Sequence, residues 1–450
     1  MYISAKKYII NILSDERNKR FTINTLINFI TRFGVIGVNL LMVPLLLSVV
    51  GKERFGIWQT ILVVISWSSL LNFGLGNGVR NLITKLIIEK RHEEIGPAIG
   101  SALKIISKIV FFASIFIIPG IYFLLNPDRL FSGNQIPEKE VIISFSVFAG
   151  YFLLNIILSL SSSIAYGFQK SAIAGITNLS YLLLCYLSIL IAIQFTILNL
   201  IDIAFIFGSL QSLVFLVSLF WQVKRFDIKI NLKEKYSLSS VYNLSGSFFA
   251  VQLLSILFFS IDNFVISITL GASQTAEFSI LSKIFYAIIG VFSVLLIQLW
   301  NSVTEANIKN NNKWIINIGK RLALFAMILF LGTLIISTFK DNLLHFWLGN
   351  QFLNISYTSF YLFSIYTFVH CLNAILANIQ NGLGELKLQM ASIFISLVIY
   401  ITGCFILDVK NLGYNYLIVL KIIGTVVAIG INLISVRNLQ NQNRTLTNEI

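Results

Sequence analysis

The sequence predicts an all-α polytopic membrane protein with about twelve transmembrane helices in two pseudo-symmetric six-helix lobes. Three observations carry this prediction: the length and number of the apolar stretches, the alternation of basic residues between loops, and an internal repeat. The 450 residues are 56% hydrophobic and 12% charged, with a mean hydropathy of +0.84. This composition is far more apolar than that of a soluble globular domain.

Each apolar stretch is about 20 residues long, the length that a helix needs to cross a hydrocarbon core of roughly 30 Å. The stretches are continuously apolar, whereas barrel strands alternate and are about ten residues long. The predicted helices cover residues 21–50, 55–73, 99–125, 141–166, 173–194, 197–223, 241–269, 275–304, 320–339, 356–380, 388–408 and 414–436. Residues 1–20 are interpreted as a retained cytoplasmic tail, because they lack the cleavage site of a signal peptide.

Basic residues alternate between the two sides of the predicted bundle. The tail, the even-numbered loops and the C-terminus hold 22 Lys or Arg, whereas the odd-numbered loops hold six. The positive-inside rule therefore predicts that both termini are cytoplasmic. The net charge of +14 is mostly this topology signal. The sequence argues against nucleic-acid binding, because the loops are short and no basic patch is interleaved with exposed aromatic residues.

The chain contains an internal repeat, in which connections between predicted helices recur about 217 to 220 residues later. Gly51 in SVVGKERFGIWQTI matches Gly271 in SITLGASQTAEFSIL, and Gly167 matches Gly384 in the connections after the fourth and tenth helices. Both halves begin on the same side of the membrane, so the repeat is parallel. We predict an N-terminal lobe (1–223), a cytoplasmic linker (224–240) and a C-terminal lobe (241–450). Two such lobes around a central site are the plan of a transporter.

A charged residue at the centre of a membrane span costs about 2.5–3.5 kcal/mol. Each one is therefore expected to have a structural or functional role. Arg32 lies twelve residues into the first predicted span, and we expect it to line a cavity or to form an internal ion pair. The other intramembrane cations are Lys104, Lys108, Lys283 and Lys421, against one clearly buried acid, Asp262. This excess of cations predicts a site for an anion such as a phosphate or pyrophosphate.

The alternatives to substrate binding differ among these residues. Lys104 is near the cytoplasmic end of its span and could snorkel to the lipid head groups. Lys421 is interpreted as an interfacial anchor. Asp262 is expected either to neutralise a cation or to act on substrate or coupling ion. Two prolines within spans, Pro44 and Pro119, should kink their helices, either for flexing or as static packing features.

The polar stretch from Gly74 to Gly100 predicts an amphipathic helix on the cytoplasmic face or continuing the second span. Its apolar stripe is Val79, Leu82, Ile83, Leu86 and Ile87. Arg80 follows a Gly-rich break and is expected either to reach a lipid head group at the cavity mouth or to anchor the topology.

No pattern in the sequence indicates catalysis, a metal or a cofactor. The three cysteines lie inside spans without a CxxC motif, and His370 is alone in the tenth span, which favours a core residue over a metal ligand. The FGLGNG segment at Gly74, Gly76 and Gly78 follows a transmembrane helix, whereas a dinucleotide fingerprint must follow a parallel strand. We therefore expect a protein that is not an enzyme.

The chain resembles a known family over essentially its whole length, and three segments carry the resemblance. INFITRFGVIGVNLLMVPLLLSVVGKERFGIWQT, LLNFGLGNGVRNLI and FSIDNFVISITLGASQTAEFSILSKI are similar to the polysaccharide transporter family. This family holds the O-antigen and capsule repeat-unit flippases of the multidrug/oligosaccharidyl-lipid/polysaccharide exporter (MOP) superfamily. The positions that match its recurrent patterns are Arg32, Gly78, Arg80, Asn81, Asp262 and Lys283.

The resemblance implies the fold shared with multidrug exporters (MATE-like) and a location in the bacterial inner membrane. It implies movement of an undecaprenyl-pyrophosphate-linked oligosaccharide from the cytoplasmic to the periplasmic leaflet, where polysaccharide polymerase machinery uses it. A multidrug or organic-cation antiporter is an alternative, but such a protein should hold acids in its lobes. A membrane glycan polymerase or ligase is a further alternative that needs a larger outward loop, and peptidoglycan-precursor flippases are another.

Overall fold

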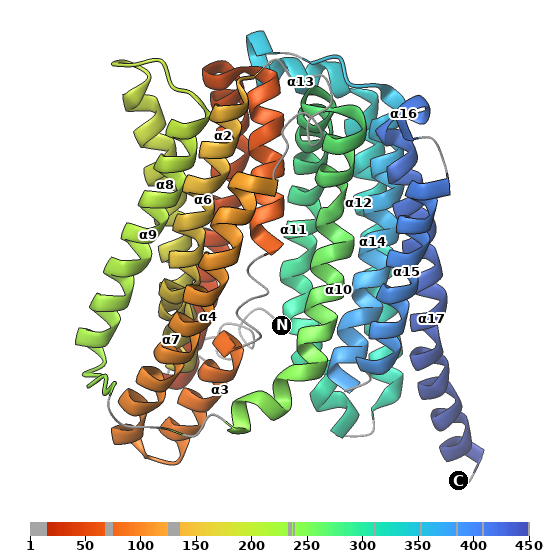
Figure 1. The fold of residues 1–450 in the computed structure, drawn as a ribbon. Helices are drawn as coiled ribbons and strands as arrows, with labels where there is room; N and C mark the ends of the chain where they lie inside the picture. Colours follow the sequence, from red (N-terminus) through yellow and green to blue (C-terminus); the bar gives the residue numbers. More distant parts are fainter. Residues whose placement is uncertain are drawn as a thin grey trace, which may run out of the picture.

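The computed structural model describes residues 16–67, 75–124, 136–232, 236, 239–308, 311–351, 353–383, 386–406 and 409–448, and these residues form helices without any strand. The helices of the first lobe are α2 (Glu16–Trp67), α3 (Leu75–Ile88), η2 (His92–Glu94), α4 (Ile95–Leu124), α6 (Glu138–Leu158), α7 (Leu160–Gly167), α8 (Ser171–Ala192) and α9 (Leu200–Arg225). The second lobe holds α10 (Ser239–Leu270), α11 (Ala272–Ile308), α12 (Asn312–Thr338), α13 (Lys340–Leu348), η3 (Gly349–Gln351), α14 (Tyr357–Leu383), α15 (Leu386–Ile406), α16 (Val409–Leu412) and α17 (Tyr414–Asn448). Figure 1 shows the two sets of helices as neighbouring bundles.

The predicted count of membrane crossings is confirmed. Eleven helical segments of the described chain are long and apolar enough to span a membrane. The first of them, Leu26–Trp67, has 42 residues, twice the length that one crossing needs. Its backbone leaves the helical conformation at Gly51, with φ 80° and ψ 171°, so it makes two crossings. The chain is a multi-pass membrane protein with twelve spans.

Gly51 and Gly271 are equivalent in the two lobes, as their sequence match predicts. Gly271 has φ 88° and separates α10 from α11. A side chain at positive φ is strained, so glycine is the residue that allows both reversals. The other predicted match cannot be compared, since Gly167 ends α7 whereas Gly384 lies outside the described residues. We call the end of the bundle with Gly51 and Gly271 the turn end, and the opposite end, with the C-terminus, the tail end.

Each lobe holds an aromatic cluster made by its even-numbered spans. In the first lobe, the ring of Trp58 lies 4.9 Å from that of Phe148 and 5.1 Å from that of Phe207. In the second, Phe278 lies 5.5 Å from Phe363 and 6.0 Å from Tyr414. The clusters come from the second, fourth and sixth spans of each lobe. The repeat therefore extends from the turns to the packing of the core.

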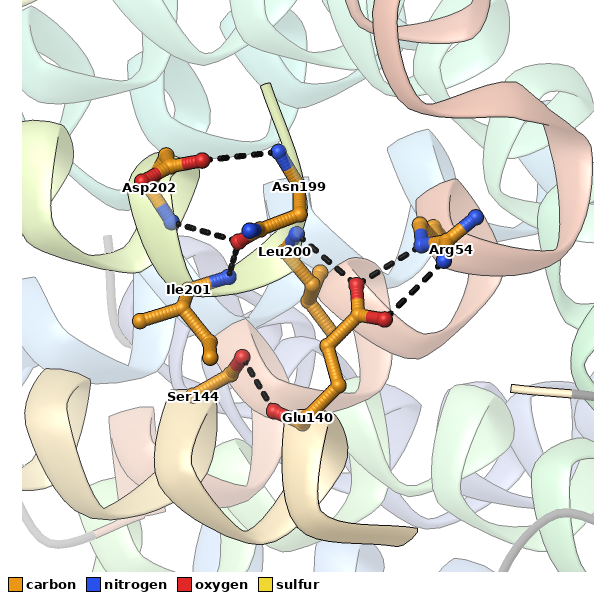
Figure 2. A network of polar contacts seen from close by, with 7 residues as sticks. All are labelled: Arg54, Glu140, Ser144, Asn199, Leu200, Ile201 and Asp202. Atoms are coloured by element: carbon orange, nitrogen blue, oxygen red, sulfur yellow. Dashed lines mark hydrogen bonds and ion pairs between the residues drawn. The ribbon is translucent and has the colours of Figure 1, made fainter. Parts of the chain in front are cut away.

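A network of polar contacts joins three spans of the first lobe at the turn end (Figure 2). Arg54 donates two hydrogen bonds to Glu140, at 2.7 and 2.9 Å, and Glu140 also accepts from the backbone N–H of Leu200 at 3.0 Å. Asn199 and Asp202 form a capping box at the start of α9. A bidentate charged contact fixes direction as well as distance, so the network holds this end of the lobe together.

The amphipathic helix predicted after Gly74 is α3, but its apolar stripe faces protein. Val79, Ile83 and Leu86 are fully buried, and the hydroxyl of Thr84 donates to the carbonyl oxygen of Gly167 at 3.0 Å. The helix packs against α4, α7 and α10. Neighbouring helices, not lipid, therefore cover this stripe, and whether the helix continues the second span depends on residues 68–74, which lie outside the described residues.

The segment after α9 lies on the first lobe. The carbonyl oxygens of Lys229 and Asn231 approach Gly96 and Gly100 so closely that a Cβ on either glycine would lie 2.0 or 2.3 Å from them. The backbone N–H of Tyr236 donates to the Ser101 hydroxyl at 2.9 Å. Part of the predicted 224–240 linker is thus docked on α4. The boundaries of the two lobes stay a prediction.

Candidate functional site

The two lobes meet along α2 on one side and α10 and α11 on the other. The first half of α2 contacts α11, where Arg32 reaches Ser293. Its second half contacts the start of α11 at the turn end and α10 farther along, where the indole N–H of Trp67 donates to the Ser260 hydroxyl at 2.7 Å. The first span of each lobe thus lies beside the second span of the other. This exchange is the arrangement that a parallel repeat gives around an axis along the membrane normal.

At the turn end this interface is closed by charge and by close packing. Lys52 donates to Glu277 across the lobes at 2.6 Å, and both side chains are less than one-third exposed. Gly56 lies against the backbone of Ala272, where an added Cβ would fall 1.9 Å from the carbonyl oxygen. The substitution of any larger residue for Gly56 would therefore push the two lobes apart.

A third contact between the lobes lies beside Pro44, which is inside α2. Proline has no N–H, so the carbonyl oxygen of Leu40, four residues earlier, loses its helical donor. The indole N–H of Trp347, on α13 of the second lobe, donates to this oxygen at 3.0 Å. The carbonyl oxygen that Pro44 leaves without a helical donor is therefore a docking point between the lobes, whereas the kink at Pro44 stays a prediction.

Toward the tail end, Arg32 is exposed on α2, and its Nη2 donates to the Ser293 hydroxyl of α11 at 3.1 Å. The nineteen residues from Arg32 to Gly51 rise about 28 Å, close to the full thickness of a hydrocarbon core. Arg32 therefore lies in the tail-end part of the membrane, not at its centre as the predicted span placed it. The predicted span began too early, since about 20 residues before Gly51 are enough to cross the core and α2 continues beyond them to Glu16.

Lys283 lies at the same interface, nearer the turn end. It is on α11, and its Nζ lies 5.3 Å from the ring centre of Phe55 in the first lobe. A cation over an aromatic face is stabilised by the ring quadrupole. Arg32 and Lys283 are thus the two predicted cations that the fold brings to the contact between the lobes.

The other predicted cations lie elsewhere. The Arg80 guanidinium is exposed and lies 5.0 Å from the ring centre of Tyr166, within the first lobe. Lys104 and Lys108 are exposed on one face of α4. Farther along that face the exposed side chains are Phe111, Phe112, Ile115 and Phe116. An exposed apolar stripe with lysines at one end suits lipid and its head groups.

Asp262 forms a buried ion pair with Lys421, and both side chains are less than 5% exposed. Asp262 also accepts from the Tyr400 hydroxyl at 2.8 Å, and Lys421 donates to the carbonyl oxygen of Phe259 at 3.2 Å. The interpretation of Lys421 as an interfacial anchor is wrong. The reason is that Asp262, 159 positions earlier in the sequence, lies beside it and provides its counter-charge.

Several residues of the interface escaped the sequence reasoning. Lys52 and Glu277 follow the two matched turns, and their charges are opposite, which is the one signal that could have paired them. Ser293 and Trp347 carry no such signal, because their partners are set by the packing of the lobes. The part of the chain that the structure describes holds no group of three or more His, Cys, Asp or Glu that could bind a metal ion.

Comparisons with known sequences and solved structures identify proteins that are similar to this chain. No family model matches the chain. It is 26% identical over 366 residues to a putative O-antigen export protein of Yersinia pseudotuberculosis, which covers 77% of this chain and 79% of that protein. It is 22% identical over 353 residues to a putative O-antigen transporter of Salmonella typhimurium, covering 75% and 78% of the two chains.

Among solved structures, an inward-facing multidrug resistance MATE family transporter of the MOP superfamily superposes with a TM-score of 0.71. The identity is 14%, with 94% of this chain and 99% of that chain covered. The lipid II flippase MurJ, in an inward closed conformation, gives a TM-score of 0.70 at 15% identity, with 92% and 87% covered. The chain has the fold of the MOP superfamily, and the resemblance to its polysaccharide transporters is confirmed by relatives named O-antigen exporters and transporters.

Proposed function

We propose that this protein is a flippase for undecaprenyl-pyrophosphate-linked oligosaccharide repeat units of O-antigen or capsule. It moves them from the cytoplasmic to the periplasmic leaflet of the inner membrane by alternating access and delivers them to the polysaccharide polymerase machinery. The observation that carries the proposal is Arg32, an exposed guanidinium where α2 of one lobe meets α11 of the other. The names of the relatives support the same class of cargo.

The chemistry of Arg32 suits a pyrophosphate. A guanidinium carries five N–H donors in a planar fork that binds phosphate oxygens in pairs. Ser293 accepts one of them. Lys283 adds a second positive charge along the same interface. A pyrophosphate head group would meet these cations as it passes between the lobes.

The distribution of basic residues among the loops favours one orientation in the membrane, and this orientation defines the direction of transport. With the tail end in the cytoplasm, Arg32 lies toward the leaflet in which the substrate is made. The turn end then faces the periplasm and is held shut by the Lys52–Glu277 and Trp347–Leu40 contacts. Translocation requires these contacts to break while the lobes close around Arg32.

The organic-cation antiporter fits the charges less well. A cation site needs an acid that is free to pair with the substrate. Asp262 is already paired with Lys421, and no other Asp or Glu is buried among the residues whose side chains the structure describes. The balance of charge at the interface therefore favours an anionic cargo.

The test replaces Arg32 in a strain that lacks its own flippase for a defined surface glycan. Arg32→Ala should abolish or strongly reduce the glycan ladder, because the head group loses both charge and hydrogen bonds. Arg32→Lys should retain part of the activity, since it keeps the charge and loses the fork. Lys104→Ala, an exposed cation away from the interface, is the matched control and should give a normal ladder.

Immunoblots of the membrane fraction show whether each variant is inserted. A normal ladder from an inserted Arg32→Ala protein would contradict the proposal. Equal losses from Arg32→Ala and Lys104→Ala would contradict the assignment of the interface as the site.

A further inference from the structure

The first half of α2 has two exposed faces of opposite character. Successive residues of a helix are about 100° apart, so their positions around the helix follow from their numbers. One exposed face carries Arg32 and Asn39, which are seven residues and nearly two full turns apart. The other face, roughly 150° away around the helix, is apolar and consists of Leu26, Ile30, Phe33 and Leu41.

A helix from each lobe separates these two faces. On one side, a Cβ added to Gly34 would lie 2.9 Å from Leu179 of α8. On the other side, a Cβ added to Gly290 of α11 would lie 3.3 Å from Ile36. An exposed guanidinium or amide against hydrocarbon is costly, so the apolar face is the one that suits lipid. The polar face lies on the opposite side of α2, bounded by α8 of the first lobe and α11 of the second.

Asn39 is an exposed amide near the middle of the membrane. It lies twelve residues before Gly51, which is about 18 Å from the turn end in a hydrocarbon core of roughly 30 Å. Its Nδ2 donates to the carbonyl oxygen of Val35 in its own helix at 2.8 Å. An amide has two N–H donors and an oxygen acceptor, so this local bond leaves the oxygen and one N–H for another partner.

The polar face of α2 continues onto α8. The Nδ2 of Asn28, one turn before Arg32, donates to the Ser171 hydroxyl of α8 at 2.7 Å. Asn178 lies seven residues after Ser171, on the same side of α8, and its side chain is exposed. The exposed apolar residues of α8 lie roughly 140–180° around the helix from Asn178; they include Ile176, Leu183 and Leu187.

Asn178 lies at the depth of Arg32. A Cβ on Gly175 of α8 would lie 2.5 Å from the Thr31 hydroxyl of α2, and Leu179 lies against Gly34. The segment of α8 that holds Asn178 is therefore beside the segment of α2 that holds Arg32. Two exposed amides thus accompany the guanidinium on one continuous polar face.

We propose that Asn39 and Asn178 form a saccharide subsite that binds the sugar attached to the pyrophosphate and contributes to the choice of cargo. This inference rests on the proposed flippase function and names the part of the substrate that these residues select. The seven residues from Arg32 to Asn39 rise about 10 Å toward the turn end. The head group and the sugar would therefore take successive positions along one face of α2.

The chemistry of an amide suits a sugar better than a phosphate. Phosphate oxygens only accept hydrogen bonds, so the amide oxygen has nothing to receive from them. A sugar hydroxyl donates and accepts, and two neighbouring hydroxyls can pair with both ends of one amide. Neutral amides also add no charge to the attraction that Arg32 already provides.

The test compares three lipid probes on full-length protein in detergent micelles. They are undecaprenyl pyrophosphate without a sugar, and the same lipid bearing one N-acetylglucosamine or one galactose. Native mass spectrometry of equimolar mixtures gives the ratio of bound sugar-bearing to bound sugar-free lipid. The unchanged protein should favour at least one sugar-bearing probe by about tenfold, the effect of one or two net hydrogen bonds.

The variant Asn39→Leu with Asn178→Leu should bind the sugar-free probe as before and lose the preference. Both side chains are exposed, so the change leaves the core intact. Asn39→Gln with Asn178→Gln keeps both amides and should retain part of the preference. Asn354→Leu, at an exposed asparagine of the turn-end loop before α14, is the matched control and should retain all of it.

Arg32→Ala should weaken the binding of all three probes by a similar factor, because it removes the contact with the pyrophosphate. If the unchanged protein binds none of the probes, the flippase proposal and the subsite are both wrong. The subsite alone is overturned if neither sugar is favoured, or if the double leucine variant keeps the preference. It is also overturned if that variant loses the sugar-free probe to the same extent as the sugar-bearing ones.

Discussion

The two lobes place different chemistry at equivalent positions of the same architecture. In the first lobe, the buried side chains of the described residues include amides and hydroxyls but no charge. In the second lobe, Asp262 and Lys421 are buried where the first lobe has Met42 and Phe207. The aromatic clusters around Trp58 and Phe278, by contrast, are alike. Apolar packing therefore builds the repeat, and the buried charges are a specialisation of one copy.

The sharpest way to break this comparison is to remove one charge of the pair. Asp262→Asn leaves the Lys421 ammonium buried without a counter-charge, which should cost about 3–5 kcal/mol of stability. The paired change of Asp262→Asn with Lys421→Gln should recover most of that loss. Thermal unfolding in detergent, followed by fluorescence, gives both values. A single variant as stable as the unchanged protein would mean that water reaches the pair.

A smaller effect should be shared by the two lobes. Trp58→Leu and Phe278→Leu each remove the aromatic side chain from the centre of an equivalent aromatic cluster. Each should cost about 1–3 kcal/mol, because the smaller side chain leaves a cavity. The same unfolding assay compares them. If one lobe loses much more than the other, the two clusters are not equivalent in packing.

The docking of α13 on the first lobe should have a moderate effect. Trp347→Phe keeps the aromatic ring but leaves the Leu40 carbonyl oxygen without its indole donor. We expect a loss of about 1–2 kcal/mol and a larger distance between spin labels at the turn end. Trp314→Phe, an exposed tryptophan of α12, is the control and should change neither. An unchanged distance in Trp347→Phe would mean that this hydrogen bond has no part in holding the lobes together.

The smallest expected effect is a difference between the substitutions of two neighbouring basic residues, Lys52 and Arg54. Lys52 pairs with Glu277 across the lobes, whereas Arg54 pairs with Glu140 inside the first lobe. A partly exposed ion pair is worth about 1 kcal/mol at most, which is roughly a fivefold change in an equilibrium. Lys52→Gln should therefore raise the population with separated turn ends by up to that factor.

The reference variant for this measurement is Arg54→Gln, which should leave the population unchanged. Exchange of the partners, Lys52→Glu with Glu277→Lys, should restore it. Equal shifts from Lys52→Gln and Arg54→Gln would show that the cross-lobe pair has no special part in closing the turn end.

The sequence by itself determined the fold class, the twelve spans and the equivalence of Gly51 and Gly271. These follow from properties that are local in the chain: the length of an apolar helix and the demand for glycine at positive φ. The sequence also singled out Arg32, Lys283 and Asp262, because any charge inside a span must have a reason. It misjudged the depth of Arg32, since the start of a helix that continues beyond the membrane is not marked by hydropathy.

Only the tertiary structure decided the partners. It set Lys421 against Asp262, Trp347 against the Leu40 carbonyl oxygen, and Ser293 against Arg32. Each contact joins residues more than 150 positions apart in the sequence. Residues so distant meet through the packing of whole helices, which depends on the side chains of every helix between them. A single charge in a span indicates that the charged residue has a partner. Only the packing of the helices determines which residue that partner is.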